Sequence, residues 1–137
     1  TYGYLEAEYK DYLADLTGDG IITDNSGLIP RNTPENTFGF TTSYTTQIGD
    51  GELKGRISYR FRDEMNSDSS NNPYGDLDSI ENVNATIGYT INNYSVTVWG
   101  RNLTDEREQR WATIGGLTSR GWWNEPQTLG ITFAASY

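Results

Sequence analysis

The sequence of 137 residues contains no cysteine and no histidine. The lack of cysteine excludes disulfides and thiolate metal sites, and the lack of histidine removes the commonest general base and metal ligand. Basic residues are few: ten Lys and Arg stand against nineteen Asp and Glu, so the net charge is −9. This charge argues against a nucleic-acid partner, because phosphate binding requires clustered cations. Without a Ser–His or Cys–His pair we expect no enzymatic activity.

Long hydrophobic runs are also absent. Hydrophobic residues make up 34% of the chain, and none of its apolar runs approaches the roughly 20 residues that a transmembrane helix needs. Aromatic residues nevertheless reach 13%, and this abundance of Tyr and Trp, with fifteen Gly, favours β-structure with polar loops. A membrane-spanning β-strand needs only about 10 residues of alternating character. The chain begins at Thr1 without a signal peptide, so we expect an excerpt or a processed product.

Alternation of apolar and polar residues is the main structural signal. At the C-terminal end of the chain, every second residue is apolar and the series ends on Tyr137, while small or polar residues lie between. In 52–62 the residues opposite the apolar set are mostly basic. The pattern predicts an all-β fold, an antiparallel meander of about six strands in one segment over 1–137. The predicted strands are 2–12, 37–48, 52–62, 83–91, 94–102 and 127–137.

The predicted connections differ in length at the two ends of the sheet. Gly49-Asp50-Gly51 and Asn92-Asn93 form tight turns, whereas 14–36, 63–82 and 103–126 are long polar loops. Short turns at one end and long loops at the other are typical of outer-membrane β-barrels, although a soluble up-and-down barrel can share this layout. Membrane barrels have at least eight strands. We therefore expect the missing strands to come from a longer chain or from partner chains.

Three segments resemble TonB-dependent outer-membrane receptors. Residues 94–106, YSVTVWGRNLTDE, resemble the penultimate strand and the Asn-Leu-Thr-Asp loop start of that family. Residues 124–133, NEPQTLGITF, resemble the approach to its final strand, and 30–37, PRNTPENT, resemble a loop-to-strand passage several strands earlier. The likeness therefore covers nearly the whole chain in the family's order. One departure is that the family commonly ends in Phe, whereas this chain ends in Tyr137.

The resemblance implies that the chain is the C-terminal part of a 22-stranded transmembrane β-barrel in the bacterial outer membrane. Such a receptor imports a scarce nutrient: an iron–siderophore complex, cobalamin, haem or an oligosaccharide. The resemblance does not indicate which of these is the cargo. The implied partners are the plug domain, the remaining barrel strands and TonB acting through the plug, none of which this sequence contains. Further partners are outer-membrane lipid, lipopolysaccharide and the barrel-assembly machinery, which would recognise Tyr137; that residue also suits an interfacial aromatic girdle.

Two sets of residues are candidates for a site. Basic side chains opposite the apolar face are predicted to face the lumen, since each would cost ~2–4 kcal/mol on the lipid face at mid-bilayer; these are Lys54, Arg56, Arg60 and Arg101. They can pair with plug carboxylates, attract anionic cargo, or simply form a solvated wall. The loop 103–126 supplies aromatic and Arg side chains for ligand binding, or for packing against neighbouring loops; these are Trp111, Trp122, Trp123, Arg110 and Arg120.

The segment 15–24 matches the first eight positions of an EF-hand calcium loop, with oxygen ligands at Asp15, Thr17 and Asp19. Position 12 of that loop is Ser26 instead of Glu, and no helices flank the segment, so we expect a turn-rich loop and no cofactor. The alternative function is a soluble β-rich carbohydrate-binding module with this calcium loop and a tryptophan platform. A third possibility is the end of a porin or an adhesin-type barrel.

Overall fold

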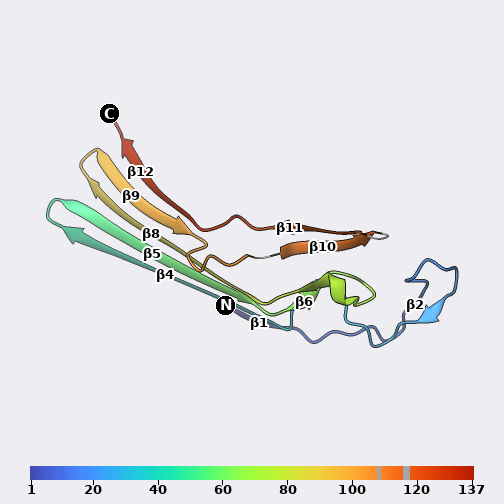
Figure 1. Ribbon diagram of the computed structural model, residues 1–137. Helices are drawn as coiled ribbons and strands as arrows, with labels where there is room; N and C mark the ends of the chain where they lie inside the picture. The colour runs from blue at the N-terminus through green and yellow to red at the C-terminus, as the bar shows by residue number, and fades with distance from the viewer. Residues whose placement is uncertain (108, 116–117) are drawn as a thin grey trace.

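The chain folds as one antiparallel sheet with long connections at one end (Figure 1). The computed structural model describes residues 1–107, 109–115 and 118–137, and for 110–115 and 118–120 it describes the backbone only. Six strands lie side by side in sequence order: β1 (Tyr2–Tyr4), β4 (Asn36–Ile48), β5 (Gly51–Arg62), β8 (Ile80–Ile91), β9 (Tyr94–Arg101) and β12 (Thr128–Ala135). The predicted all-β antiparallel meander is confirmed. In the described part of the chain, no helix has the length and apolar character needed to cross a membrane.

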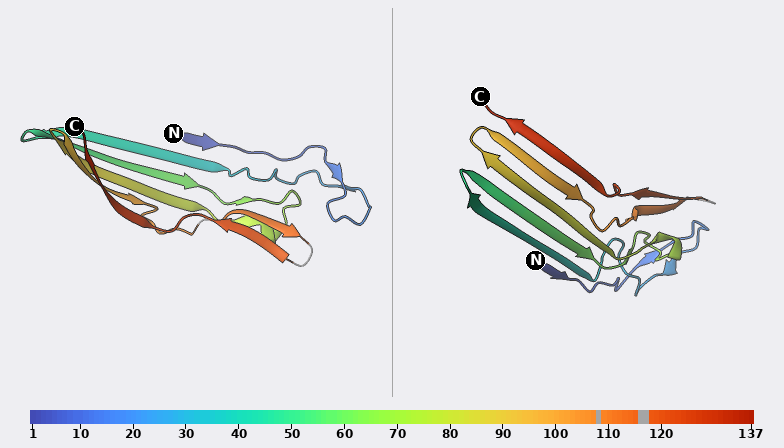
Figure 2. Two further views of the ribbon diagram at one scale, coloured as in Figure 1. Left: turned by 90° about the horizontal axis from the view of Figure 1, so that it is seen from above. Right: turned by 60° about the vertical axis from the view of Figure 1, so that its left-hand side comes forward.

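Tight turns join β4 to β5 and β8 to β9 at one end of the sheet, and the long loops leave from the other end (Figure 2). Gly49 and Asn92 open these turns with φ of 60° and 49°, a region that Gly and Asn adopt more readily than other residues. The C-terminus lies at the turn end, where the backbone N–H of Ser136 donates to the carbonyl of Asn93 at 2.9 Å. Tyr137 lies beyond β12 and is fully exposed.

The structure differs from the sequence prediction in several connections. The first strand covers only Tyr2–Tyr4 instead of 2–12, because beyond it the chain pairs irregularly with the segment before β4, as in the Leu5 N–H to Glu35 carbonyl bond of 2.9 Å. β8 begins at Ile80, three residues before the predicted 83.

The predicted loops also contain short paired strands. Loop 14–36 and its approach hold β2 (Leu13–Ala14) and β3 (Thr23–Asp24), and loop 63–82 holds β6 (Met65–Asn66), the 3-10 helix η1 (Pro73–Gly75) and β7 (Asp76–Leu77). The predicted long loop over 103–126 contains a further pair of strands, β10 (Gln109–Gly115) and β11 (Thr118–Trp123), which lie outside the six-stranded sheet. Its Thr, Ile and Trp residues have high β-propensity, so these two strands pair with each other without joining the main sheet.

The register gives the sheet one apolar and one polar face. A central row across five strands runs Tyr44, Gly55, Ile87, Val98, Ile131, and the adjacent row on the other face runs Ser43, Arg56, Thr86, Trp99, Gly130. The apolar row is exposed; Ile131, for example, is 74% accessible. Among the residues that the structure describes, the only buried hydrophobic side chains are Leu77 and Ile80, near the loop end. The sheet's own apolar face therefore has no covering layer within the described residues.

Candidate functional site

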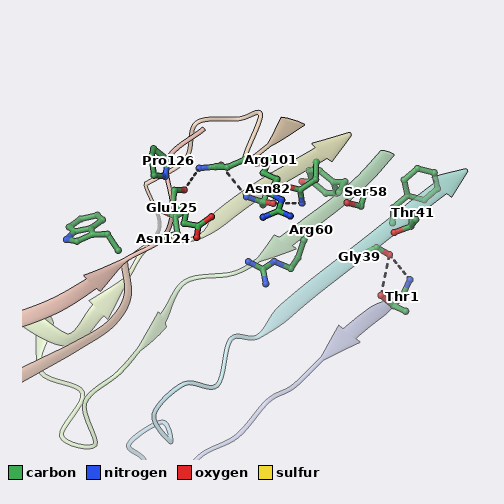
Figure 3. A pocket seen from close by; sticks show the side chains of 15 residues that line it. Thr1, Gly39, Thr41, Ser58, Arg60, Asn82, Arg101, Asn124, Glu125 and Pro126 are labelled. Carbon is green, nitrogen blue, oxygen red and sulfur yellow. Dashed lines mark hydrogen bonds between the residues drawn. The ribbon is translucent and has the colours of Figure 1, made fainter. Parts of the chain in front are cut away.

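A concave site of about 840 Å³ lies on the polar face, where the central strands approach the long loops (Figure 3). β5 contributes Ser58 and Arg60, and β8 contributes Asn82 and Asn84. The end of β9 and the segment between β11 and β12 complete the wall with Arg101, Asn102, Trp123, Asn124, Glu125 and Pro126. The lining is thus rich in amide and guanidinium groups, with one indole and one carboxylate.

Strand register explains why these side chains converge. Arg60 pairs with Gly39 on one side and with Asn82 on the other, so the three residues form a row across β4, β5 and β8. The next row toward the tight turns contains Ser58 and Asn84. Residues two apart on a strand share a face, which places both rows in the same site. Gly39 contributes no side chain, and Oγ1 of Thr1 occupies the space beside it.

Asn102 is the hub of the site's wall. It is 5% exposed and adopts a φ of 49° just after β9 ends. Its Nδ2 donates to the carbonyls of Glu106 at 2.9 Å and of Glu125 at 3.1 Å. Its Oδ1 accepts from the N–H of Glu106 at 3.1 Å and from Nδ2 of Asn82 at 3.2 Å. One amide side chain therefore ties β8, the loop after β9 and the segment before β12 together.

The residues that follow Asn102 form further hydrogen bonds at the junction where the end of β9 meets β8 and the segment before β12. The N–H of Leu103 donates to the carbonyl of Val83 at 2.8 Å, and Oγ1 of Thr104 donates to the carbonyl of Glu81, also at 2.8 Å. Oδ1 of Asp105 accepts from the N–H of Gln127 at 3.2 Å. The Asn-Leu-Thr-Asp stretch that carries the family resemblance is thus a structural fastening between β8, β9 and β12.

The polar face of the sheet is strongly basic. Five cationic side chains on the six strands point to this face and one acidic side chain opposes them; the cations are Lys54, Arg56, Arg60, Arg62 and Arg101, and the acid is Glu52. Glu52 lies 2.5 Å from Lys54, near the tight turns and away from the site. The guanidinium of Arg101 lies 5.3 Å from the ring centre of Trp99, which positions it by a cation–π contact. The positive charge of the face is therefore concentrated toward the loop end.

The four basic residues predicted to face a lumen share the polar face, and the site brings Arg60 and Arg101 together while Lys54 and Arg56 lie nearer the tight turns. That this face lines a lumen remains a prediction. Of the predicted aromatic loop residues, Trp123 lines the site and Trp122 does not. The side chains of Arg110, Trp111 and Arg120 lie outside the described residues. Sequence reasoning missed the asparagines, although their spacing at 82, 84 and 102 was visible.

The calcium-like loop has its own hydrogen bonds. The carboxylate of Asp15 accepts from the backbone N–H groups of Thr17, Gly18 and Gly20, at 3.1, 2.6 and 2.7 Å. These donors, that of Gly20 first, hold the pKa of the Asp15 carboxyl below its ordinary value. Among the described residues, no group of three or more acidic side chains is arranged to hold a metal ion. That the segment is a turn-rich loop, with calcium at Asp15, Thr17 and Asp19 only as the alternative, remains a prediction.

Comparison with known proteins supports the fold. No family model and no curated protein matches the chain. Among solved structures, it is similar to the ferric yersiniabactin uptake receptor FyuA from Yersinia pestis, with a TM-score of 0.72 and 17% identity over 85% of this chain. At this identity the likeness shows the fold alone. The six-stranded sheet matches part of a TonB-dependent receptor barrel, and the chain spans 19% of that receptor's length.

Proposed function

We propose that this chain is part of an outer-membrane TonB-dependent receptor that imports a scarce nutrient: an iron–siderophore complex, cobalamin, haem or an oligosaccharide. The observation that carries the proposal is the two-faced sheet. Its apolar face is exposed along its length, and its polar face holds the cations and the concave site. Lipid outside and a polar lumen inside match these two faces.

The length of the strands fits this environment. β4 has 13 residues, and β5 and β8 have 12 each. At ~3.3 Å per residue such strands are roughly 40 Å long, and a tilt of ~45° reduces this to about 28 Å across the membrane. An apolar band of ~25 Å is expected for outer-membrane barrels. These three strands are therefore long enough to cross the hydrocarbon layer, whereas β9 and β12, with 8 residues each, are shorter.

The proposed orientation follows from the two ends of the sheet. The tight turns and Tyr137 lie on the periplasmic side, and the long loops lie outside the cell. In this arrangement lipid and lipopolysaccharide contact the apolar face, while a plug domain and the remaining strands complete the barrel. TonB acts through the plug, and the barrel-assembly machinery recognises Tyr137. The cations at Lys54 and Arg56 face the lumen below the concave site.

The soluble carbohydrate-binding module remains the rival function. A soluble domain of this size needs a buried apolar core, since smaller domains already bury about 60% of the surface that their unfolded chains expose. In the described residues the buried hydrophobic side chains are Leu77 and Ile80 alone. A soluble fold would need a second layer over the exposed face of the sheet.

Neighbouring residues on β8 provide the test, because this segment has no cysteine of its own to interfere with labelling. The full-length protein carrying Ile87→Cys, on the apolar face, or Thr86→Cys, on the polar face, would be labelled with bimane and reconstituted with brominated lipid. We expect the lipid to quench the label at 87 several-fold more strongly than at 86. The pair Val98→Cys and Thr97→Cys on β9 repeats the comparison.

Equal quenching at the two positions of both pairs would contradict the proposal. Recovery of the protein as a folded monomer in the periplasmic fraction, without detergent, would favour the soluble module instead.

A further inference from the structure

The apolar face of the sheet carries a hollow of about 490 Å³ around Gly55, in the central row of β5. Apolar side chains from β4, β5, β8, β9 and β12 surround it, among them Tyr44, Ile57, Ala85, Ile87, Val98 and Leu129. We propose that this hollow holds one acyl chain of a phospholipid from the periplasmic leaflet of the outer membrane. The inference rests on the proposed function, because it requires the apolar face to lie against lipid.

Gly55 differs from the other glycines of the six-stranded sheet. Each of the others has a side chain of the protein less than 3.0 Å from the position that a Cβ would take; these glycines, each with its cover, are Gly3 (Thr37), Gly39 (Thr1), Gly51 (Tyr89), Gly88 (Thr97), Gly100 (Leu103) and Gly130 (Trp99). At Gly55 nothing lies within 4 Å of that position. A glycine inside a strand weakens it, and it often marks a bulge or a place where a ligand approaches the backbone closely.

A bulge does not explain Gly55. The residue lies opposite Tyr44 on β4 and Ile87 on β8, and the register is continuous along both ladders. The neighbouring Tyr89 does not fill the space either, because its ring covers Gly51 and its hydroxyl donates to the carbonyl of Ile48 at 2.8 Å. The space above Gly55 is therefore available to a partner from outside the sheet.

The walls of the hollow favour an uncharged occupant. Between the row of Ile48 and the row of Phe40, the described strands place no charged side chain on the apolar face. Arg56, Thr86 and Trp99 also border the hollow, but the register places their side chains on the polar face. Inside a bilayer the hydrophobic effect does not favour protein over lipid, so binding depends on dispersion contacts. A hydrocarbon chain supplies these contacts, which an empty hollow would lose on every wall.

The depth of the hollow indicates the leaflet. Gly55 is the fifth residue of β5 counted from the tight turn, which places it about 9 Å above Gly51 at ~3.3 Å per residue and a tilt of ~45°. This is less than half of the expected apolar band of ~25 Å. Toward the loop end, Phe38, Phe40 and Tyr59 share the same face, and the ring centres of Phe38 and Tyr59 are 5.9 Å apart. These rings narrow the approach from the outer leaflet, so the chain enters from the side of the tight turns.

Lipid retention by the full-length protein tests the proposal. The protein is purified in detergent and mixed with phosphatidylglycerol that carries either palmitoyl or hexanoyl chains, and native mass spectrometry counts the lipids that stay bound. We expect one palmitoyl lipid to be retained and the hexanoyl lipid to be retained about tenfold less, because the head groups are identical and only the long chain reaches the hollow. In a second arm, protein extracted from outer-membrane vesicles is examined for retained lipopolysaccharide.

Four variants locate the lipid. Gly55→Leu fills the hollow and should lower retention of the palmitoyl lipid about tenfold, which corresponds to ~1.4 kcal/mol. Gly55→Ala should give an intermediate loss. Tyr44→Ala removes a wall without filling the hollow, so it tests the site independently and should lower retention about threefold. Ala135→Leu is the matched control, because it adds a similar side chain to the same face outside the hollow; it should change retention less than twofold.

Each variant must first pass the lipid-quenching test with labels at 86 and 87, which shows that the barrel is inserted. Equal lipid retention by the original protein, Gly55→Leu and Tyr44→Ala would overturn the proposal. So would the loss of lipopolysaccharide or of a bound protein, instead of phospholipid, from Gly55→Leu. If the original protein itself fails the quenching test, the proposed function falls.

Discussion

Replacement of Asn102 by Ala should open the junction between β8, β9 and β12. The change removes two donor bonds and three acceptor bonds of 2.9 to 3.3 Å from a side chain that is 5% exposed. A typical hydrogen bond contributes a net ~0.5–1.5 kcal/mol, so we take about 2–4 kcal/mol for the set. The φ of 49° adds about 1 kcal/mol, since Ala tolerates the left-handed region less well than Asn. The expected loss of local stability is therefore about 3–5 kcal/mol.

Hydrogen exchange measures this loss where it occurs. The amide of Glu106 donates to Asn102, and that of Gln127 donates to Asp105 at the same junction. A loss of about 3 kcal/mol accelerates exchange through local opening by roughly a hundredfold. Amides in the centre of β5 should exchange at an unchanged rate, because they are held by the ladders to β4 and β8.

Asn92 is the matched control for the backbone contribution. It has the same φ of 49°, but it lies in a tight turn and its side chain forms no hydrogen bond with the described residues. Asn92→Ala should thus cost only about 1 kcal/mol. Asn102→Gly should recover the backbone contribution and keep the hydrogen-bond loss. The contrary result would be that Asn102→Ala accelerates exchange of the amides beside residue 102 no more than Asn92→Ala accelerates exchange beside residue 92. In that case the side-chain hydrogen bonds of Asn102 do not hold β8, β9 and β12 together.

Two further changes test other parts of the structure. Gly130→Ala should displace the ring of Trp99, because the added Cβ would collide with that indole. We expect about 1–3 kcal/mol of destabilisation and a change in Trp99 fluorescence. Gly55→Ala, with open space around it, should leave both unchanged. The loop around Asp15 should be fully ordered above pH ~3.9, the ordinary pKa of Asp. Its order should be lost as the pH falls through the lowered pKa that Asp15 has in the folded protein. The reason is that the ionised carboxylate accepts the N–H of Gly20. Carboxyl chemical shifts followed by NMR would show this; a normal Asp15 pKa, or loop ordering by added Ca²⁺ at neutral pH, would contradict the self-contained turn.

The sheet and its two faces were predictable because a strand has a period of two. In β5 and β12 the alternation alone assigns every residue to a face, and the tight turns at Gly49 and Asn92 fix how β4 pairs with β5 and how β8 pairs with β9. The prediction failed where pairing is irregular or local. After Tyr4 the alternation continues in the sequence, but charged residues replace the apolar set and the chain leaves the sheet.

The concave site was only half visible in the sequence. The cations Arg60 and Arg101 were found because they oppose an apolar face, which is a local property of each strand. Asn82 and Asn102 were missed because their role depends on contacts between residues 20 positions apart and on the hydrogen bond of Asn102 to Glu125. Such contacts follow from the register between strands, which local patterns constrain but do not specify.

The division between fastening and binding residues explains why sequence resemblance can reveal the fold while the cargo stays open. Asn102 and Asp105 hold the segment before the last strand against the end of β9. A barrel with a long loop at this position needs such contacts regardless of its ligand. Arg60 and Arg101 line the concave site beside this junction, and Arg101 contacts Trp99 there. Residues of the second kind can change with the ligand at little risk to the fold, since they lie on a polar surface. The fold therefore depends on the junction, and the polar face beside it can vary without disturbing that fold.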